Sequence, residues 1–232
     1  MPCILCLFLG MNPWTLIVPS GGIGSRMGAE RPKQYLEING QPILLHTLRV
    51  LDEYFDNPVF IVPVANEWRD YVQKTLENHP LGGKVVLVSG GKERYDSVKN
   101  ALSSLNTPWV AVHDAVRPFV NRVTVERLKE ALSNYQAAIP VLELKESIRK
   151  RTQEGTLAAN RSAFVSVQTP QCFHSEVLKA AYEQSFDEAL TDDASVVERL
   201  GVSIHCVFGN EENIKITTPT ELIVATHRLE YR

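Results

Sequence analysis

Cysteine is scarce, and the four cysteines present lack the pattern of a metal site or a disulfide framework. Cys3 and Cys6 have Cys-x-x-Cys spacing, but no second pair lies nearby, and Cys172 and Cys206 are isolated. Structural zinc sites and disulfide frameworks both need further cysteines or histidines at defined spacings. The sequence therefore argues against both and predicts reduced thiols, as is typical of a cytoplasmic protein.

An excess of charge of either sign is also missing. The chain has 24 Lys and Arg against 27 Asp and Glu, which gives a formal net charge of −3. Nonspecific binding to nucleic acid or to an acidic membrane surface needs a broadly basic face. We therefore expect neither partner, and an anionic substrate would have to be bound by a local cluster of cations.

Long hydrophobic runs are absent as well. The first ten residues, MPCILCLFLG, are apolar, but a transmembrane helix needs about 20 such residues. They also lack the basic start and the small-residue cleavage site of a signal peptide. We expect residues 1–13 to be a disordered leader, with Met11 as an alternative start, and we expect no membrane span.

The remaining chain shows a regular alternation of apolar and amphipathic segments. Its 232 residues are 44% hydrophobic, which is enough for one substantial core, so we expect a single domain over residues 14–232. This alternation is typical of βαβ units and predicts an α/β fold with a mostly parallel sheet. Short apolar runs predict strands at 16–18, 59–62, 85–88, 109–112, 137–141, 164–167, 204–208 and 214–216. Amphipathic stretches predict helices at 42–55, 68–76, 97–105 and 123–132, and from Ser175, Asp192 and Pro219.

A charged excursion interrupts the alternation. Residues 143–160 are polar and irregular, and basic and acidic side chains are interspersed along them. Glu154-Gly155 offers a hairpin turn within this stretch. We therefore predict a protruding two-stranded β-arm at about residues 142–163.

The stretch after the first predicted strand has the composition of a phosphate-binding loop. Ser20, Gly21 and Gly22 follow the apolar run, and two cations, Arg26 and Lys33, follow the glycines. Glycine lets the backbone approach a ligand closely, and exposed amides in such a turn can bind phosphate. The cations could neutralise charge that develops on phosphate oxygens during a transfer reaction.

Three other interpretations of this loop compete with that one. An ordinary turn of an α/β domain would look similar. The P-loop pattern G-x-x-x-x-G-K-[ST] is absent. A dinucleotide fold would carry an acidic residue at the end of the second strand, where this chain has Pro63-Val64-Ala65-Asn66.

Further polar stretches follow the ends of later predicted strands, where open parallel sheets bind ligands. A second glycine-rich turn contains Gly91 and leads to Ser97, although it could equally be a loop with a helix cap. A carboxylate at Asp114 could bind Mg²⁺ and Arg117 could grip a phosphate, or the two could simply brace their loop. Lys215 lies in an apolar run, where lysine is unusual unless it points into a cleft or a salt bridge.

Two of these motifs carry a family resemblance. The sequence PSGGIGSRMG at residues 19–28, followed by PKQYL at 32–36, resembles the start of the nucleotidyltransferases that activate sugar and polyol phosphates. The second motif is most similar to the 2-C-methyl-D-erythritol 4-phosphate cytidylyltransferase family, and the resemblance extends from Trp14 to the last predicted helix. It implies a Rossmann-like nucleotidyltransferase sheet, transfer of CMP from CTP to a polyol phosphate, Mg²⁺ as cofactor, and a homodimer formed through the arm.

The resemblance also implies roles for individual residues. Arg26 and Lys33 would stabilise the α-phosphate of CTP in the transition state, while Asp114 would hold Mg²⁺ and substrate. Arg161 and Lys215 would position methylerythritol phosphate for attack and so count with the catalytic residues. The CTP pocket would be lined by Ser20, Gly21, Gly22, Gly91 and Ser97. Further contacts to methylerythritol phosphate would come from Arg117, Ser147, Thr169 and Thr191.

The sequence departs from the family pattern at a few positions, and two other assignments compete with this one. Ser20 stands where the family commonly has alanine, Lys92 where some members have an acid, and the register around Ser147 in the arm is loose. Ribitol-5-phosphate cytidylyltransferases share the same phosphate loops, but the sequence TDDAS at 191–195 favours methylerythritol phosphate. A non-catalytic nucleotide-binding regulator is a third alternative, and the presence of two loop cations argues against it.

Overall fold

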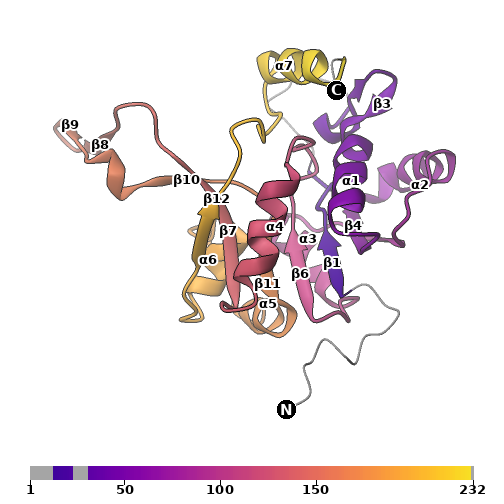
Figure 1. Ribbon diagram of the computed structural model, residues 1–232, viewed down its shortest axis with the longest axis horizontal. Coiled ribbons are helices and arrows are strands. Elements are labelled where there is room, and N and C mark those ends of the chain that lie inside the picture. Colours follow the sequence, from indigo (N-terminus) through magenta and orange to yellow (C-terminus); the bar gives the residue numbers. More distant parts are fainter. Residues whose placement is uncertain (1–12, 23–30, 231–232) are drawn as a thin grey trace.

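The computed structural model describes residues 13–22 and 31–230, so residues 1–12 of the predicted leader and Arg26 lie outside the described part. Within these residues an eight-stranded sheet forms the centre of the molecule (Figure 1). One half of it consists of parallel strands in the order β6-β1-β4-β5. These strands are β1 (Trp14–Ile17), β4 (Val59–Val64), β5 (Val85–Ser89) and β6 (Trp109–Val112).

The other half of the sheet mixes directions. Strands β7 and β12 pair in parallel, whereas β10 and β11 run antiparallel to β7, and β11 lies between β6 and β7. Among the described strands of this sheet only β10 and β11 oppose the common direction, so the prediction of a mostly parallel sheet is confirmed. These strands are β7 (Ala137–Glu143), β10 (Val165–Val167), β11 (Gln171–His174) and β12 (His205–Phe208).

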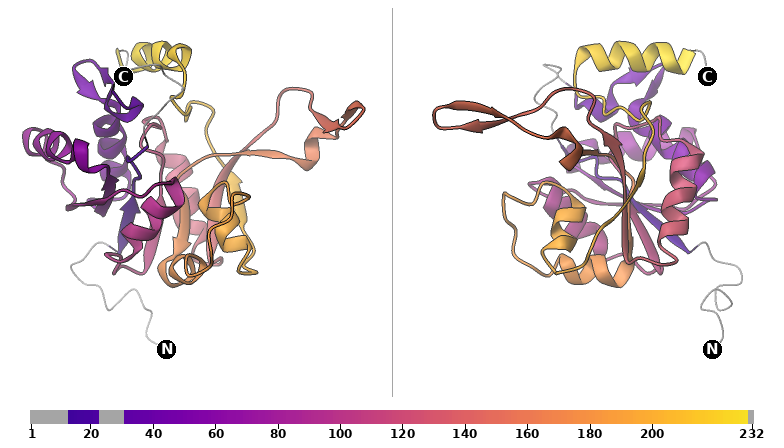
Figure 2. Two further views of the ribbon diagram at one scale, coloured as in Figure 1. Left: turned by 180° about the vertical axis from the view of Figure 1, so that it is seen from behind. Right: turned by 60° about the vertical axis from the view of Figure 1, so that its left-hand side comes forward.

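Helices cover both faces of the sheet (Figure 2), and this is why its strands are continuous apolar runs. Successive residues of a strand point to opposite faces. Leu16 therefore packs into one core and its neighbour Ile17 into another. The helices of the Leu16 core are α1 (Ile43–Tyr54), α2 (Arg69–Asn78) and α4 (Arg122–Ala131). Those of the Ile17 core are α3 (Arg94–Leu102), α5 (Ser175–Ala181) and α6 (Asp193–Glu198).

The last helix, α7 (Pro219–Glu230), lies apart from these two layers (Figure 1). Its buried Ala225 joins a third core with Ile38 and Ile43, close to the short hairpin β2 (Glu37–Ile38) and β3 (Gln41–Pro42). No helix in the described part of the chain combines the length and the apolar character that crossing a membrane requires.

Three local expectations were wrong. The run 214–216 is not a strand: Ile216 is buried and its amide donates to the Val116 carbonyl at 3.0 Å, but the segment joins no sheet. Strand β11 escaped prediction because only Cys172 and Phe173 are apolar in it. Helix α3 begins three residues early, because Glu93 caps it in a reciprocal capping box with Asp96.

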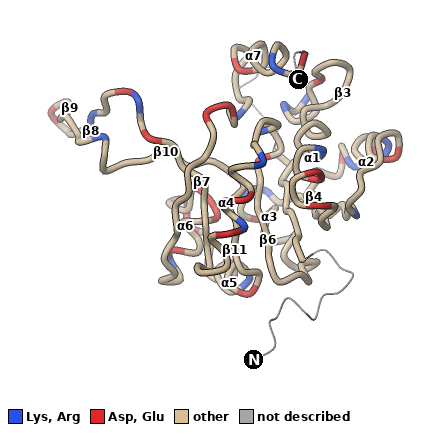
Figure 3. Tube along the Cα trace, viewed as in Figure 1, with Lys and Arg blue, Asp and Glu red and all other residues tan. Residues whose placement is uncertain are grey.

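The charged excursion contains a hairpin of β8 (Arg149–Thr152) and β9 (Gly155–Ala158). Gly155 has φ 141, a backbone conformation that favours glycine, and every residue of the two strands is exposed. Figure 2 shows the hairpin extending away from the main sheet, and Figure 3 shows basic and acidic residues along it. We call residues 142–163 the arm.

Candidate functional site

The first glycine-rich loop continues from β1 alongside β4. The amide of Val18 donates to the Ile61 carbonyl at 3.0 Å, and the amide and hydroxyl of Ser20 both donate to the Pro63 carbonyl at 2.9 and 3.0 Å. Ser20 is buried and turned toward the backbone of β4. Residues 19–22, which we call the nucleotide loop, are thus held in place beyond the end of the strand.

The next two glycines leave backbone donors available. The amides of Gly21 and Gly22 donate to no acceptor within residues 13–22 and 31–230. Backbone amides exposed in a glycine-rich turn are suited to bind an anion. The predicted loop therefore has the required donors, although Arg26 lies outside the described residues.

The second glycine-rich loop lies against the first. A Cβ atom added to Gly21 would lie 3.5 Å from the Gly90 Cα atom and 3.6 Å from the Ser97 hydroxyl. Gly91 is tightly confined, because a Cβ atom there would lie 2.1 Å from the Cβ of Asp96. The Gly91 amide donates to the Ser97 hydroxyl at 2.9 Å, which in turn donates to the Glu93 carbonyl at 3.1 Å. Ser97 thus shapes the loop from within.

The loop after β6 carries the strongest charge cluster of the site. Oδ2 of Asp114 accepts a hydrogen bond from Arg117 Nε at 2.9 Å and lies 3.1 Å from Lys215 Nζ. Burial alone would raise the pKa of Asp114, but Lys215, Arg94 and Arg117 hold that pKa well below its usual range. The carboxylate is therefore ionised at neutral pH. It holds Arg117 from its own loop and Lys215 from a distant segment side by side.

Thr169 and His113 brace this loop from behind. The Asp114 amide donates to Thr169 Oγ1 at 3.1 Å, and His113 Nδ1 lies 3.1 Å from the same oxygen. His113 Nε2 lies 3.0 Å from the Arg117 carbonyl, and burial lowers the pKa of His113 to about 4. A neutral imidazole that is committed on both nitrogens indicates a structural role for His113. Thr169 is buried, and its hydroxyl contacts the loop that carries Asp114.

Arg94 belongs to this cluster although the sequence analysis did not select it. Its Nη2 lies 2.5 Å from Oδ2 of the fully buried Asp193, and its Nε lies 3.9 Å from Oδ1 of Asp114. Tyr182 donates its hydroxyl to the other oxygen of Asp193 at 2.6 Å. Burial opposes the charge of Arg94, but Asp193 and then Asp114 raise its pKa above the ordinary value. No local signal in the sequence indicates that Arg94 would meet residues so distant along the chain.

Two hollows flank the cluster. A groove of about 410 Å³ is lined by Arg117 and Lys215 together with residues of β10 and the segment around Asn213. A smaller pocket of about 130 Å³ is lined by residues that include Arg94 and Thr191. Thr191 is exposed, and Asp192 rather than Thr191 caps α6. The groove therefore leaves the charge cluster accessible to an anionic ligand on the side of Arg117 and Lys215.

Lys33 lies near the nucleotide loop, on a short 3-10 helix, Lys33–Tyr35. The next two residues of that helix contact the loop directly. Gln34 donates to the carbonyls of Ser20 and Gly22 at 2.6 and 2.9 Å, and Tyr35 donates to the Ser20 carbonyl at 2.9 Å. The Pro-Lys-Gln-Tyr motif is thus brought against the glycine-rich motif that precedes it.

The two predicted arm residues are not brought to the charge cluster of their own chain. Arg161 is exposed, and its guanidinium donates to the Lys145 carbonyl within the arm at 2.5 Å. Ser147 is exposed on the same arm. The structure of one chain therefore unites the two loops, Asp114, Arg117, Thr169 and Lys215, and leaves Arg161 and Ser147 elsewhere.

Comparison with known proteins identifies relatives of the whole chain. A model of the 2-C-methyl-D-erythritol 4-phosphate cytidylyltransferase family matches residues 14–231. The protein of that name from Bacteroides thetaiotaomicron is 41% identical over 213 residues, which cover 91% of this chain and 97% of the relative. The crystal structure of the Thermus thermophilus protein of that name is 30% identical with a TM-score of 0.75, covering 92% of this chain and 97% of that one. The 4-diphosphocytidyl-2C-methyl-D-erythritol synthase of Anaerococcus prevotii has a TM-score of 0.80 at 26% identity, covering 94% and 98%.

Proposed function

Because the chain belongs to the 2-C-methyl-D-erythritol 4-phosphate cytidylyltransferase family, we propose that it transfers CMP from CTP to 2-C-methyl-D-erythritol 4-phosphate. The products are pyrophosphate and 4-diphosphocytidyl-2-C-methyl-D-erythritol, an intermediate of non-mevalonate isoprenoid synthesis. The observation that carries this proposal is the family match over residues 14–231, which includes every residue of the candidate site.

The chemistry needs no general base. A phosphate oxygen of the polyol phosphate attacks the α-phosphorus of CTP, and the bond to the pyrophosphate leaving group breaks. That oxygen is already a nucleophile at neutral pH, so catalysis consists of positioning two polyanions and stabilising the charge that develops. Lys33 and Arg26 would supply this stabilisation at the α-phosphate. His113, which is buried and neutral at pH 7, takes no part in proton transfer.

The two substrates would occupy opposite sides of the charge cluster. The cytidine and its phosphates would lie on the nucleotide loop and the second glycine-rich loop, which supply the Gly21 and Gly22 amides. The polyol phosphate would lie in the groove that Arg117 and Lys215 line, whereas Thr191 lines the smaller pocket and Thr169 supports the Asp114 loop from its buried side. Asp114 would keep both cations aimed at this phosphate, because one of its oxygens binds the two of them.

We propose Mg²⁺ as the cofactor, and the residues present fit it. Oδ2 of Asp114 is engaged by Arg117 and Lys215, but within the described residues Oδ1 has only Arg94 Nε at 3.9 Å. No group of three acidic, His or Cys side chains suited to a metal exists in the described part of the chain. Mg²⁺ needs few protein ligands and takes the rest from phosphate and water, so one ionised carboxylate suffices. When bound, it would neutralise charge on the triphosphate.

We further propose a homodimer formed through the arm. Leu157, Phe164 and Val165 are 62%, 51% and 42% exposed in the single chain, which is unusual for apolar side chains this close together in the sequence. A second copy of the chain would cover them. Arg161, whose own chain holds it away from the charge cluster, would then reach the site of the partner, together with Ser147. A cytoplasmic location stays a prediction from the cysteine content.

The decisive experiment measures pyrophosphate release from CTP with purified protein. We expect release with 2-C-methyl-D-erythritol 4-phosphate and little with ribitol 5-phosphate under the same conditions. The reverse preference would assign the chain to ribitol phosphate. CTP binding without pyrophosphate release from either substrate would support the regulator instead.

A further inference from the structure

We propose that Gln34 is a positioning residue, whose side-chain amide orients the nucleotide loop, residues 19–22, for binding CTP. The proposal rests on the cytidylyl transfer proposed above. Gln34 is 3% exposed, and its Nε2 donates to the Ser20 carbonyl at 2.6 Å and to the Gly22 carbonyl at 2.9 Å. One side-chain nitrogen thus uses both of its hydrogens on carbonyls that lie two residues apart in the same loop.

The bond to the Ser20 carbonyl sets the direction of the Gly21 amide. In a trans peptide the carbonyl and the following amide point in opposite directions. Because the Ser20 carbonyl is turned toward Gln34, the Gly21 amide must point away from Gln34. The amides of Gly21 and Gly22 have no acceptor within residues 13–22 and 31–230, so they are available to a ligand. Gln34 therefore turns two carbonyl acceptors of the loop toward itself and leaves the Gly21 amide facing the other way.

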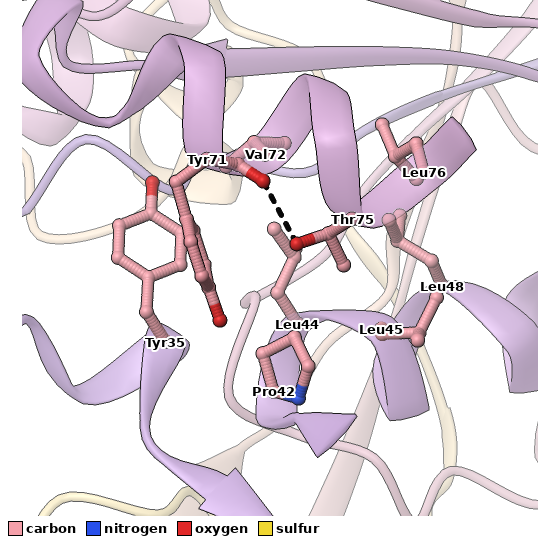
Figure 4. A pocket seen from close by; sticks show the side chains of 9 residues that line it. All are labelled: Tyr35, Pro42, Leu44, Leu45, Leu48, Tyr71, Val72, Thr75 and Leu76. Atoms are coloured by element: carbon pink, nitrogen blue, oxygen red, sulfur yellow. Dashed lines mark hydrogen bonds between the residues drawn. The ribbon is translucent and has the colours of Figure 1, made fainter. Parts of the chain in front are cut away.

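Tyr35 supports the nucleotide loop from the same side as Gln34 and makes its position more rigid. Its hydroxyl donates to the Ser20 carbonyl at 2.9 Å, so that carbonyl accepts two bonds and both of its lone pairs are occupied. The Tyr35 ring stacks on Trp68 with centroids 5.0 Å apart and meets the edge of Tyr71 at 5.6 Å. Figure 4 shows Tyr35 and Tyr71 side by side at the end of an apolar seam between α1 and α2. The nucleotide loop is thus braced against the hydrophobic core of α2.

The arrangement also couples the loop to Lys33. Gln34 and Tyr35 follow Lys33 in one 3-10 turn, which is closed by a bond from the Tyr35 amide to the Pro32 carbonyl at 2.9 Å. A turn this short has little freedom once two of its side chains are buried and bonded. The contacts that orient the Gly21 amide therefore also fix the backbone position from which Lys33 extends.

Glutamine suits this position chemically. An ionised glutamate at residue 34 has no hydrogen to donate, so it could not bond to the two loop carbonyls. The side chain of asparagine is one methylene shorter than that of glutamine. Methionine has a similar length and flexibility without any donor. Gln34→Met therefore removes both hydrogen bonds while it keeps the volume of the buried side chain.

A matched control exists elsewhere in the fold. The side-chain amide of Gln184 also donates to two backbone carbonyls, those of Ala181 and Val196 at 2.9 and 3.1 Å. Gln184→Met removes equivalent bonds at a distance from the nucleotide loop. A third variant, Tyr35→Phe, removes only the hydroxyl that supports the Ser20 carbonyl and keeps the ring packing.

The experiment compares CTP binding by calorimetry, steady-state kinetics and thermal unfolding for the three variants. We expect Gln34→Met to bind CTP about 10-fold or more weakly and to lose on the order of 10² in kcat/KM, because misplacement of positioning groups by about 1 Å has effects of this size. Tyr35→Phe should also lower CTP affinity and kcat/KM, but by smaller factors than Gln34→Met. Gln184→Met should unfold at a lower temperature but bind CTP like the wild type.

Two results would overturn the proposal. One is Gln34→Met with wild-type CTP affinity and KM, whatever its thermal stability, since a purely structural glutamine behaves this way. The other is a loss of CTP affinity in Gln184→Met as large as that in Gln34→Met. If the wild type binds CTP but never releases pyrophosphate, the cytidylyl transfer proposed above fails, whereas the binding comparison still decides the role of Gln34.

Discussion

Lys215 and Asp114 form an ion pair with Nζ 3.1 Å from Oδ2, although about a hundred residues separate them in the sequence. Arg117 donates to the same carboxylate oxygen at 2.9 Å. A phosphate needs cations that are close together, and close cations repel one another. The carboxylate between them offsets that repulsion and lowers the energy of holding both in the groove before substrate arrives.

The first prediction concerns this carboxylate. Asp114→Asn keeps the size of the side chain but removes the charge that holds Lys215 and Arg117 and that Mg²⁺ prefers. We expect kcat to fall by at least about 10², because preorganised electrostatic groups have effects of this size. Titration of activity against Mg²⁺ and against a chelator measures this. Glu53→Gln, which removes a surface ion pair with Arg122, is the control and should retain full activity. An Asp114→Asn enzyme as active as the wild type at low Mg²⁺ would move the metal elsewhere.

The second prediction concerns the cations of the glycine-rich segment. Lys33→Ala and Arg26→Ala should each lower kcat by about 10²–10³ with the fold intact, because each removes a donor to charge that develops in the transition state. Kinetics at saturating CTP and polyol phosphate, together with thermal unfolding, test this. Lys74→Ala on the exposed face of α2 is a matched control. Near-wild-type kcat in either variant would refute the transition-state role of that residue.

The third prediction concerns pH and His113. Burial lowers the pKa of His113 to about 4 in the folded chain, from an ordinary value of 6.5. Between these pH values the unfolded chain binds more protons than the folded chain, so stability is full above about pH 6.5 and falls toward pH 4. Acidification from pH 7 to pH 5 should lower the free energy of unfolding by about 2 kcal/mol through this group. Urea unfolding at several pH values measures it, and His113→Gln should show a shallower dependence. An identical slope in both proteins would contradict this assignment.

Many of the strands, and the grouping of the polar loops that follow them, could be predicted from the sequence for a physical reason. Strands covered on both faces must be apolar throughout, so runs such as Val59–Val62 and Trp109–Val112 stand out. Parallel strands place their carboxyl ends at one edge, so the polar stretch after each strand could be assigned to one site. The position of Lys215 in an apolar run pointed correctly to a salt bridge.

The remaining features depend on contacts between distant segments, which leave no local pattern. Arg94 looks like an ordinary surface residue of a helix start, but its partner Asp193 is 99 residues away. Gln34 stands out in the sequence only as part of a motif, and its function is apparent only once the loop carbonyls lie beside it. The apolar run 214–216 was mistaken for a strand because burial of Ile216 alone produces the same pattern.

The last prediction concerns the arm and the proposed dimer. Arg161 is exposed, and its guanidinium donates to the Lys145 carbonyl of its own arm rather than to the charge cluster, so we expect it to serve the site of a second chain. In such a dimer Lys33 of one chain and Arg161 of the other would complete each site. Lys33→Ala and Arg161→Ala homodimers should then both be nearly inactive.

Mixing these two inactive variants under conditions of subunit exchange gives a quantitative test. In each mixed dimer one site carries both lesions and the other carries neither. Statistical reassortment makes half of the dimers mixed, so about a quarter of wild-type activity should return. The control is Lys33→Ala exchanged with Lys33→Ala, which should stay inactive. Arms that act only within their own chain, or a monomeric protein, would give no recovery after exchange. That result would refute the shared site, whereas the cytidylyltransferase assignment, which rests on the family match, would stand.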